Sequence, residues 1–307
     1  MSFKLRLTVR GHHNYSQKYI LAGVVFIETI VILSVLFAAF LHASWNIILR
    51  NSNDKLLSMS AIALGHVPFG ILGLISFGFP NSESLIYILA SAFLHVCYMF
   101  FLLNAYRHAE LSQVYPIARG LSPLILVLIG TMFLGEYLSK YEIFGILCVS
   151  VALILYGIQI GFKSRANLRG FYYAAWTGCF IASYSLVDGY GVRVAQNAIG
   201  YTSAVDILSA ALLCLVLFLF NRKTLLGISQ HGQKTFWVGG SLGFSAYAIV
   251  LWACLHAPIS IVYTLRETSV LFAILLAIVF LKEKITLGKT LLIGVLCLGV
   301  VLIKSSQ

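Results

Sequence analysis

The chain has 307 residues, of which 60% are hydrophobic and only 10% are charged, and its formal net charge is +11. A soluble domain usually carries about 25% charged residues, so this composition excludes an ordinary soluble protein. The strands of a membrane barrel alternate between apolar and polar residues, whereas the apolar runs of this chain are continuous. This pattern favours helices over a barrel. We therefore predict an all-α integral membrane protein.

The positive charge and the cysteines do not predict a further class of partner. Lys and Arg are concentrated in short loops and in the tail, where they hold helix ends at the membrane interface, so we expect no nucleic-acid binding. All six cysteines lie inside apolar runs, without CxxC or Cys/His spacing. They are typical of small core residues, and the sequence predicts no disulfide, metal site or cofactor.

Apolar runs separated by Gly, Pro, Asn and charged residues predict ten membrane-spanning helices. They cover residues 30–49, 58–79, 85–106, 111–134, 141–162, 170–192, 200–220, 235–256, 259–281 and 287–304. Residues 1–29 form an N-terminal extension, which a true start codon further downstream would explain. The apolar run after its basic stretch is too long for a cleaved signal peptide.

The ten helices divide into two similar halves of five, residues 30–162 and 170–304. In the fourth and ninth helices, 112-SQVYPIARG-120 aligns with 260-SIVYTLRET-268. Because five is odd, the second half must enter the membrane upside down relative to the first. Inverted repeats of this kind are common in secondary transporters, whose substrate site lies near the midplane at the repeat interface.

An ordered set of motifs resembles the EamA-type ten-helix branch of the drug/metabolite transporter (DMT) superfamily. The motifs are 42-HASWN-46, 105-AYRHAELSQVYPIARGLSPL-124, 265-LRETSVLFA-273 and 294-GVLCLGVVLI-303. The resemblance spans residues 30–304 and implies two EamA repeats, the first at 30–162 and the second at 170–304. It also implies a multi-pass location in the bacterial inner (cell) membrane and movement of a metabolite or drug, without naming the substrate.

Ten crossings place both termini on the same side of the membrane. The resemblance implies that this side is the cytoplasm. The loops on the opposite side carry more Lys and Arg than the termini and the loops on their own side, and a positive-inside count therefore places the termini outside. The two indications disagree about the side.

Arg119 and Glu267 are opposite charges at matching positions of the two halves, each inside a long apolar run. A charge at such a depth costs roughly 2.5–3.5 kcal/mol and usually faces a bundle interior or a wet cavity. Arg119 either anchors an anionic group of a substrate or forms a structural ion pair with Glu267 or Asp188. Glu267 is either its partner in a permanent salt bridge or a proton carrier.

The remaining polar groups inside the helices complete a predicted pathway. Its residues are Trp45, Asn46, Tyr115, Arg119, Tyr184, Asp188, Tyr263, Arg266 and Glu267. Asp188 is either a coupling-ion or proton site or a solvated group near the interface, and Trp45 is either pathway lining or an aromatic-belt residue. Arg266 and its neighbour Glu267 should point to different sides of one helix.

Three further residues have structural interpretations. Asp206 should lie near the membrane interface, and His66 should be an isolated helix contact. Glu136, which matches Glu283 of the second half, should cap the following helix or pair with loop lysines.

The function that the sequence favours is a secondary transporter, an exporter of a small polar metabolite of the amino-acid or carboxylate type, working by alternating access. No Walker A motif occurs, so a proton gradient, a counter-substrate or the substrate's own gradient must supply the energy. The alternatives are a non-transporting scaffold or sensor and an intramembrane enzyme, for which no catalytic motif is found. Partners are the lipid bilayer and the substrate, and the sequence does not predict an oligomeric state.

Overall fold

The computed structural model describes residues 13–163, 168–282 and 286–305. The helices are α1 (His13–Arg50), α2 (Lys55–Phe77), α3 (Leu85–His108), α4 (Leu111–Phe133), α5 (Lys140–Lys163), α6 (Leu168–Ala195), α7 (Ala198–Phe220), α8 (Arg222–His231), α9 (Gly240–Cys254), α10 (Ile259–Arg266), α11 (Ser269–Leu281) and α12 (Leu287–Lys304). A short 3₁₀ turn, η1 (Ser82–Ser84), precedes α3, and a π-helical turn, η2 (Thr235–Gly239), precedes α9. No strand occurs in these residues, and the predicted all-α membrane class is confirmed.

Nine helical segments of the described residues are long and apolar enough to cross a membrane. The tenth predicted crossing corresponds to α6, which at 28 residues is also long enough to span. Its polar side chains, Asp188 and Arg193 among them, lower its hydropathy. Many of these polar positions are buried inside the protein, so α6 is a central helix that meets neighbouring helices more than lipid.

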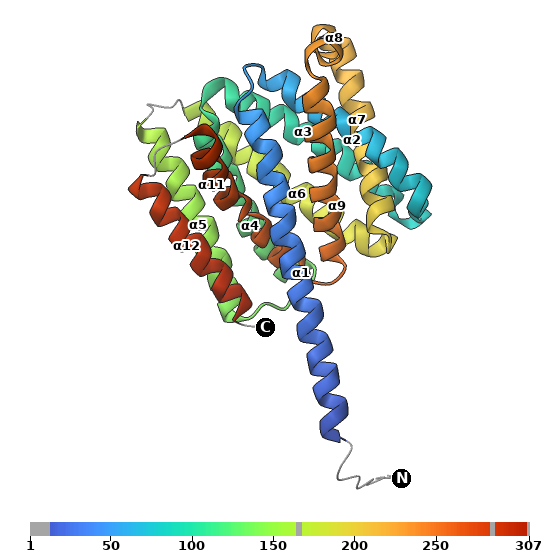
Figure 1. Ribbon diagram of the computed structural model, residues 1–307, viewed down its shortest axis with the longest axis vertical. Coiled ribbons are helices and arrows are strands. Elements are labelled where there is room, and N and C mark those ends of the chain that lie inside the picture. Colours follow the sequence, from blue (N-terminus) through green and yellow to red (C-terminus); the bar gives the residue numbers. More distant parts are fainter. Residues whose placement is uncertain (1–12, 164–167, 283–285, 306–307) are drawn as a thin grey trace.

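The helix α1 begins earlier than the predicted first crossing. It runs without a break from His13 through residue 30 to Arg50 and extends beyond the bundle in Figure 1. The predicted boundary between the extension and the first repeat is thus not marked by a change in the backbone. The described ends of α1 and α12 lie at the same end of the molecule, as an even number of crossings requires.

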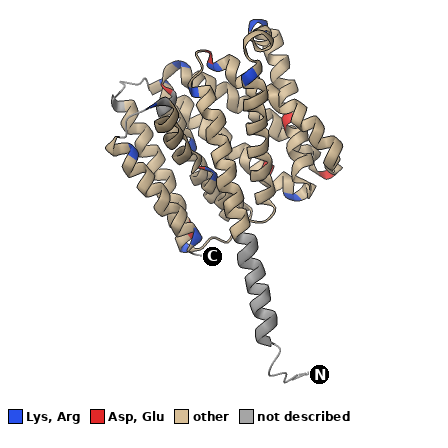
Figure 2. Cartoon of the chain, in the orientation of Figure 1, with Lys and Arg blue, Asp and Glu red and all other residues tan. Residues whose placement is uncertain are grey.

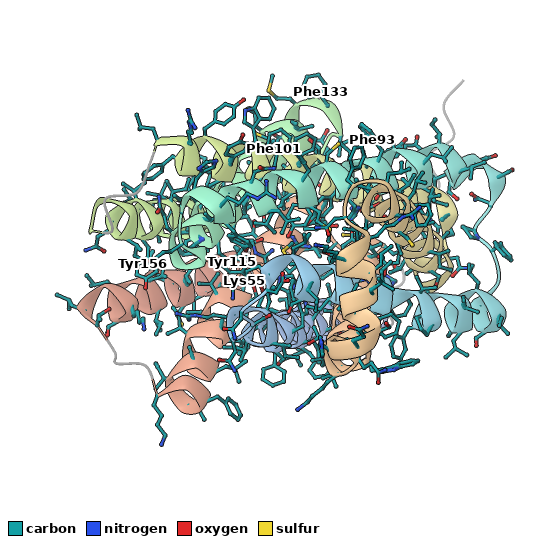
Figure 3. The ribbon with its side chains drawn as sticks, turned by 90° about the horizontal axis from the view of Figure 1, so that it is seen from above. Lys55, Phe93, Phe101, Tyr115, Phe133 and Tyr156 are labelled. Carbon is teal, nitrogen blue, oxygen red and sulfur yellow. The ribbon has the colours of Figure 1, made fainter. Side chains whose placement is uncertain are left out.

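The helices pack in a pattern that is matched between the two halves. In one layer α6 contacts α3 and α4, and in the other α1 contacts α9, α10 and α11. The layers are joined where α2 packs on α7 and α5 packs on α12. Figure 3 shows Tyr115 and Lys55 between the layers, whereas Phe133 lies at the rim.

The outside of the bundle is apolar and its interior is partly polar. Large side chains such as Phe133, Val279 and Phe280 are exposed, while charged residues gather mostly at the helix ends (Figure 2). Polar residues such as Thr177, Thr202 and Thr264 are buried inside, and their hydroxyl groups donate to backbone carbonyls. This distribution suits a protein whose solvent is lipid, where polar groups must find partners within the bundle.

Lys55 caps the C-terminal end of α1, at the loop between α1 and α2. Its ammonium donates hydrogen bonds to the carbonyl oxygens of Leu49, Arg50 and Ser52, at 2.7 to 2.8 Å. A cation here complements the negative end of the helix dipole and satisfies carbonyls that have no partner within the helix.

Close packing of α2 on η2 and α9 depends on glycine. A Cβ atom added to Gly65 would lie 2.1 Å from the carbonyl oxygen of Phe236, and one added to Gly240 would lie 2.5 Å from the carbonyl carbon of Gly65. Backbone atoms block both positions, so the helices must separate if either residue gains a side chain.

We expect Gly65→Ala to lower the melting temperature by an amount equivalent to about 1–3 kcal/mol, the usual cost of overpacking. The matched control is Gly294→Ala in α12, where a Cβ would meet no atom within 4 Å. Alanine is favoured over glycine inside a helix by about 0.5–1 kcal/mol, so the control should melt at or above the native temperature. Thermal unfolding of the detergent-solubilised variants measures both, and equal melting temperatures would contradict the packing argument.

Candidate functional site

The predicted ninth helix, residues 259–281, is interrupted at its middle. It consists of α10 and α11, separated by Glu267 and Thr268. Amide groups here donate to carbonyls three residues earlier, as in the bonds from Glu267 to Thr264 and from Thr268 to Leu265. The predicted crossing is present as the span Ile259–Phe280, and a turn of 3₁₀ type lies within it at the position of the predicted charges.

The turn places the two charges at the junction of the helices. Arg266 is the last residue of α10, Glu267 is the C-cap of α10, and Thr268 is the N-cap of α11. A mid-helix turn of 3₁₀ type often marks a functional position.

Arg119 and Glu267 form a buried ion pair between the two halves. The Arg119 Nη1 lies 3.1 Å from Glu267 Oε1, and the residues are 3% and 0% exposed. The Arg119 Nη2 also donates to the Tyr115 hydroxyl at 3.1 Å and to Ser269 Oγ at 2.9 Å. Of the two partners that the sequence left open, Glu267 is the one that Arg119 contacts.

Arg266 has fewer partners than Arg119. Its Nη2 lies 3.9 Å from Glu267 Oε1, and its guanidinium lies over the ring of Tyr263, 4.5 Å from the ring centre. Arg266 is 3% exposed, yet its Nε and Nη2 have no hydrogen-bond partner. One carboxylate, that of Glu267, therefore faces two guanidinium groups at the helix interruption. Together these three side chains carry one more positive than negative charge.

Asp188 lies apart from this pair, on α6. It accepts hydrogen bonds from the hydroxyl groups of Tyr201 on α7 and Tyr247 on α9, the former at 3.0 Å. Asp188 is fully buried, so it is not the solvated interfacial acid that the sequence also allowed. Neutral hydroxyl groups hold this carboxylate, whereas guanidinium groups hold that of Glu267.

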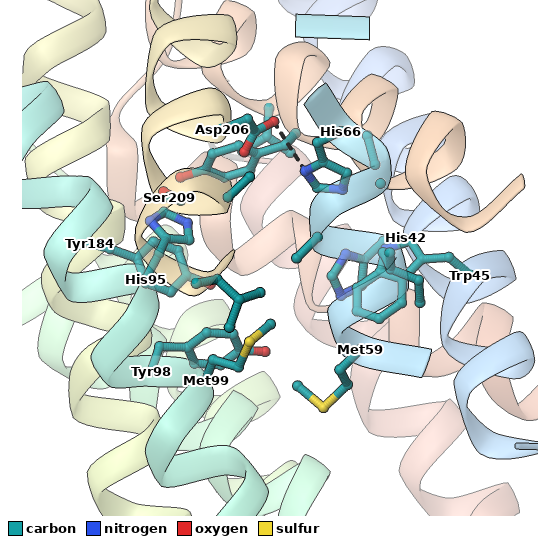
Figure 4. A pocket seen from close by; sticks show the side chains of 18 of the residues that line it. His42, Trp45, Met59, His66, His95, Tyr98, Met99, Tyr184, Asp206 and Ser209 are labelled. Carbon is teal, nitrogen blue, oxygen red and sulfur yellow. Dashed lines mark ion pairs between the residues drawn. The ribbon is translucent and has the colours of Figure 1, made fainter. Parts of the chain in front are cut away.

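A cavity of about 150 Å³ lies between the two layers of helices (Figure 4). Its walls are mostly aromatic and apolar, and they include Trp45 from α1, Tyr184 from α6 and Arg266 from α10. In Figure 4, Tyr98 and His95 of α3 face His42 and Trp45 of α1 across it.

Two further cavities contain other predicted pathway residues. A small one of about 30 Å³ is lined by Trp45, Asn46, Tyr115, Arg119 and Tyr184. A larger one of about 900 Å³ is lined by Asn46 and Tyr115 together with residues of α5, α11 and α12. Asp188, Tyr263 and Glu267, which the sequence placed in the pathway, line none of these three cavities.

The sequence analysis missed a histidine–carboxylate pair in the cavity wall. His66 Nδ1 on α2 lies 3.1 Å from Asp206 Oδ2 on α7, and Figure 4 shows this pair at one end of the cavity. Asp206 is 6% exposed and so is buried within the protein. One feature of the sequence could have indicated this pair. The helices α2 and α7 occupy equivalent places in the two halves, so polar residues on both could meet.

Glu136 caps a helix of the other half instead of the helix that follows it. Its carboxylate accepts hydrogen bonds from the amide groups of Ile259 and Ser260 and from the Ser260 hydroxyl, at the start of α10. The helix after Glu136 is stabilised by Ser139 and Glu142, which form a capping box. The matching Glu283 lies outside the described residues.

These features define a polytopic helical membrane protein with a central cavity and ionisable residues on a broken helix, and no His/Cys/Asp/Glu cluster among the described residues could hold a metal. Residues 168–305 match the model of the EamA-like transporter family, which confirms the family resemblance found in the sequence. The match supports a transporter role, since the family consists of transporters and not of enzymes.

A solved structure, described only as the crystal structure of a protein, shares the fold. Its TM-score is 0.69 at 16% sequence identity, and the alignment covers 90% of this chain and 99% of the other. At this identity the likeness concerns the fold alone. No curated protein matches the chain significantly.

We expect Glu267→Gln to be the most destabilising single change at the charged site, by about 3–5 kcal/mol, because it leaves two buried guanidinium groups without a counter-ion. Arg119→Gln should cost less, since Glu267 then keeps Arg266 nearby. The double variant should be more stable than Glu267→Gln alone. A double-mutant cycle on thermal unfolding measures the coupling, with the exposed Arg222→Gln as control. Additive single effects would refute the ion pair.

Proposed function

We propose that this chain is a secondary transporter that exports a small polar metabolite of the amino-acid or carboxylate type across the bacterial inner membrane. The moving units are two inverted five-helix repeats, residues 30–162 and 170–304. They rock about the central cavity and expose it to each side in turn, with no catalytic step.

The matched packing of the two halves supports this mechanism. The contacts of α3 with α6 and α7 have counterparts in those of α9 with α1 and α2. When the two halves share one packing pattern, they can exchange roles and so form two arrangements of similar energy. Inverted-repeat transporters use two such arrangements for alternating access.

The single observation that carries the proposal is the Arg119–Glu267 pair, of which Arg119 lines the small cavity of about 30 Å³. It joins α4 of the first half to the interruption of α10 and α11 in the second, and both residues are almost fully buried. A scaffold would gain little from it, because apolar residues of similar size often stabilise a core as well as a buried ion pair does. A transporter needs polar groups at this depth to bind and release a polar substrate.

Asp188 is the acid that we assign to energy coupling. Glu267 has two cationic neighbours that favour its ionised form, whereas Asp188 is held by tyrosine hydroxyls. An acid without a permanent counter-ion can take up and release a proton as its surroundings change. Tyr247, which donates to Asp188, also lines the cavity and connects the two sites.

We place both termini in the cytoplasm, as the family resemblance implies. Figure 2 shows most Lys and Arg at the opposite end of the bundle, and this distribution runs against that orientation under the positive-inside rule.

Cells that express the native chain should enrich their medium in a small set of related compounds, and Arg119→Lys should reduce that enrichment by about tenfold or more. Lysine keeps the positive charge but loses the planar fork that binds Glu267 and Ser269 together. Untargeted analysis of extracellular metabolites measures this, with the exposed Arg222→Lys as control and membrane levels matched. An unchanged medium with native protein in the membrane would contradict export.

Asp188→Asn should abolish the response of transport to an imposed pH gradient while leaving substrate exchange intact. Asparagine keeps one oxygen that accepts from a tyrosine hydroxyl and turns an NH2 donor toward the other hydroxyl, but it cannot carry a proton. Reconstituted vesicles with and without a pH gradient measure both activities, and the exposed Glu83→Gln is the matched control. Full gradient-driven transport by Asp188→Asn would remove Asp188 from the coupling mechanism.

A further inference from the structure

The end of the bundle that carries the termini is tied together by polar contacts between the two halves. Asn197, at the start of α7, donates to the carbonyl oxygens of Phe77 at 2.9 Å and Gly78 at 3.4 Å, at the end of α2. Asn81 donates at 2.8 Å to the carbonyl oxygen of Val194 in α6. The largest cavity lies toward the opposite end, where its wall includes the end of α1 and the start of α12. The structure is therefore held together at one end and hollowed toward the other.

Glu136 adds a contact of a different kind at the tied end. Its Oε1 accepts a hydrogen bond from the amide of Ile259 at 2.5 Å, and its Oε2 accepts from the amide and the hydroxyl of Ser260 at 3.3 and 2.5 Å. The carboxylate satisfies amides that have no partner within α10 and lies at the positive end of its helix dipole. Charge-assisted hydrogen bonds thus hold a residue of the first half against the first turn of a helix in the second.

The chain after α4 is shaped for this contact. The amides of Leu134 and Glu136 both donate to the carbonyl oxygen of Gly130, at 3.2 and 3.0 Å, so the chain folds back on the helix end. Gly135 has a φ of +65°, which glycine adopts without steric cost. A Cβ atom on Gly130 would lie 2.6 Å from Glu136 Oε2 and 2.8 Å from Ser260 Oγ. The missing side chain at Gly130 therefore leaves space for the carboxylate.

The helix α10 connects this contact to the charged site. It extends from Ile259 to Arg266, about 12 Å at the usual helical rise, and all eight of its residues are buried. Glu267 follows directly, and its carboxylate pairs with Arg119. Because closely packed interiors transmit strain, a displacement of Glu267 moves the start of α10 as well.

We propose that Glu136 is a latch for the end that carries the termini: exposing the central site to that side requires its carboxylate to release Ile259 and Ser260. This inference rests on the proposed transport function and assigns one conformational step of it to one residue. The latch joins the two units that rock against each other. Through α10, a change at the Arg119–Glu267 pair reaches this end of the bundle.

Glu142 provides a matched control, because it caps a helix at the same end but within one half. Its Oε2 accepts from the amide of Ser139 at 2.6 Å, at the start of α5. Glu136→Ala and Glu142→Ala each remove a helix-capping carboxylate and should lower the melting temperature by similar amounts. Glu136→Ala should in addition release a contact between the halves.

The test is hydrogen–deuterium exchange of the purified full-length protein in lipid nanodiscs. Glu136→Ala should accelerate exchange at residues 259–262. It should also accelerate exchange, by about fivefold or more, at residues 74–81 and 192–198, which lie outside the hydrogen bonds of Glu136. Glu142→Ala should accelerate exchange only near the start of α5. Local loss of a helix cap does not produce the remote change, whereas opening of the whole end does.

Two further variants release the latch by other routes. Gly130→Ala keeps Glu136 but places a methyl group against its carboxylate, so it should reproduce the remote acceleration. Glu136→Gln should give an intermediate result, because its single oxygen accepts from one of the amides and the negative charge is lost.

Acceleration confined to residues 259–262 in both Glu136→Ala and Gly130→Ala would reduce Glu136 to a local helix cap and overturn the latch, and so would unchanged exchange in both. Export measured in cells separates this inference from the proposed function. Remote acceleration in a chain that exports no compound would count against transport alone. Export by the native chain together with local acceleration only would count against the latch alone.

Discussion

The need to neutralise a buried guanidinium group organises the centre of this protein. Arg119 lies within a long apolar segment and is almost completely buried, where an unpaired charge would be strongly destabilising. Its counter-ion comes from the other half of the chain, and that requirement brings α4 against the junction of α10 and α11. The turn between α10 and α11 includes Glu267, so the counter-ion lies where the helix changes from α to 3₁₀ hydrogen bonding.

The sequence predicted the class and the spans but not the interruption. Apolar runs between loop signals located the membrane crossings, including residues 170–192, which lie within α6. Residues 259–281 contain no glycine or proline that would indicate a break. At the turn Glu267 and Ser269 contact Arg119, which lies almost 150 positions earlier, and local sequence patterns carry no information about such contacts.

The candidate site was likewise predictable as a set of residues but not as a set of contacts. Matching positions in the two halves identified Arg119 and Glu267, and the structure pairs them. Asp188 was identified as an unusual acid, yet the tyrosines that hold it come from two other helices. His66 and Asp206 were judged singly and therefore missed, because each is unremarkable alone and their pairing arises from the packing of α2 on α7.

The difference between the two halves at the site has a physical consequence. In the alignment of the repeats, Arg119 corresponds to Glu267, so the duplicated position holds opposite charges. Identical charges there would repel across the symmetry axis, whereas opposite charges attract. The second half carries one additional cation, Arg266, beside the shared carboxylate. Glu267 thus has two possible partners within reach, Arg119 at 3.1 Å and Arg266 at 3.9 Å. A ligand can shift a conformational equilibrium only through such a difference in interaction between states, and the excess positive charge supplies one.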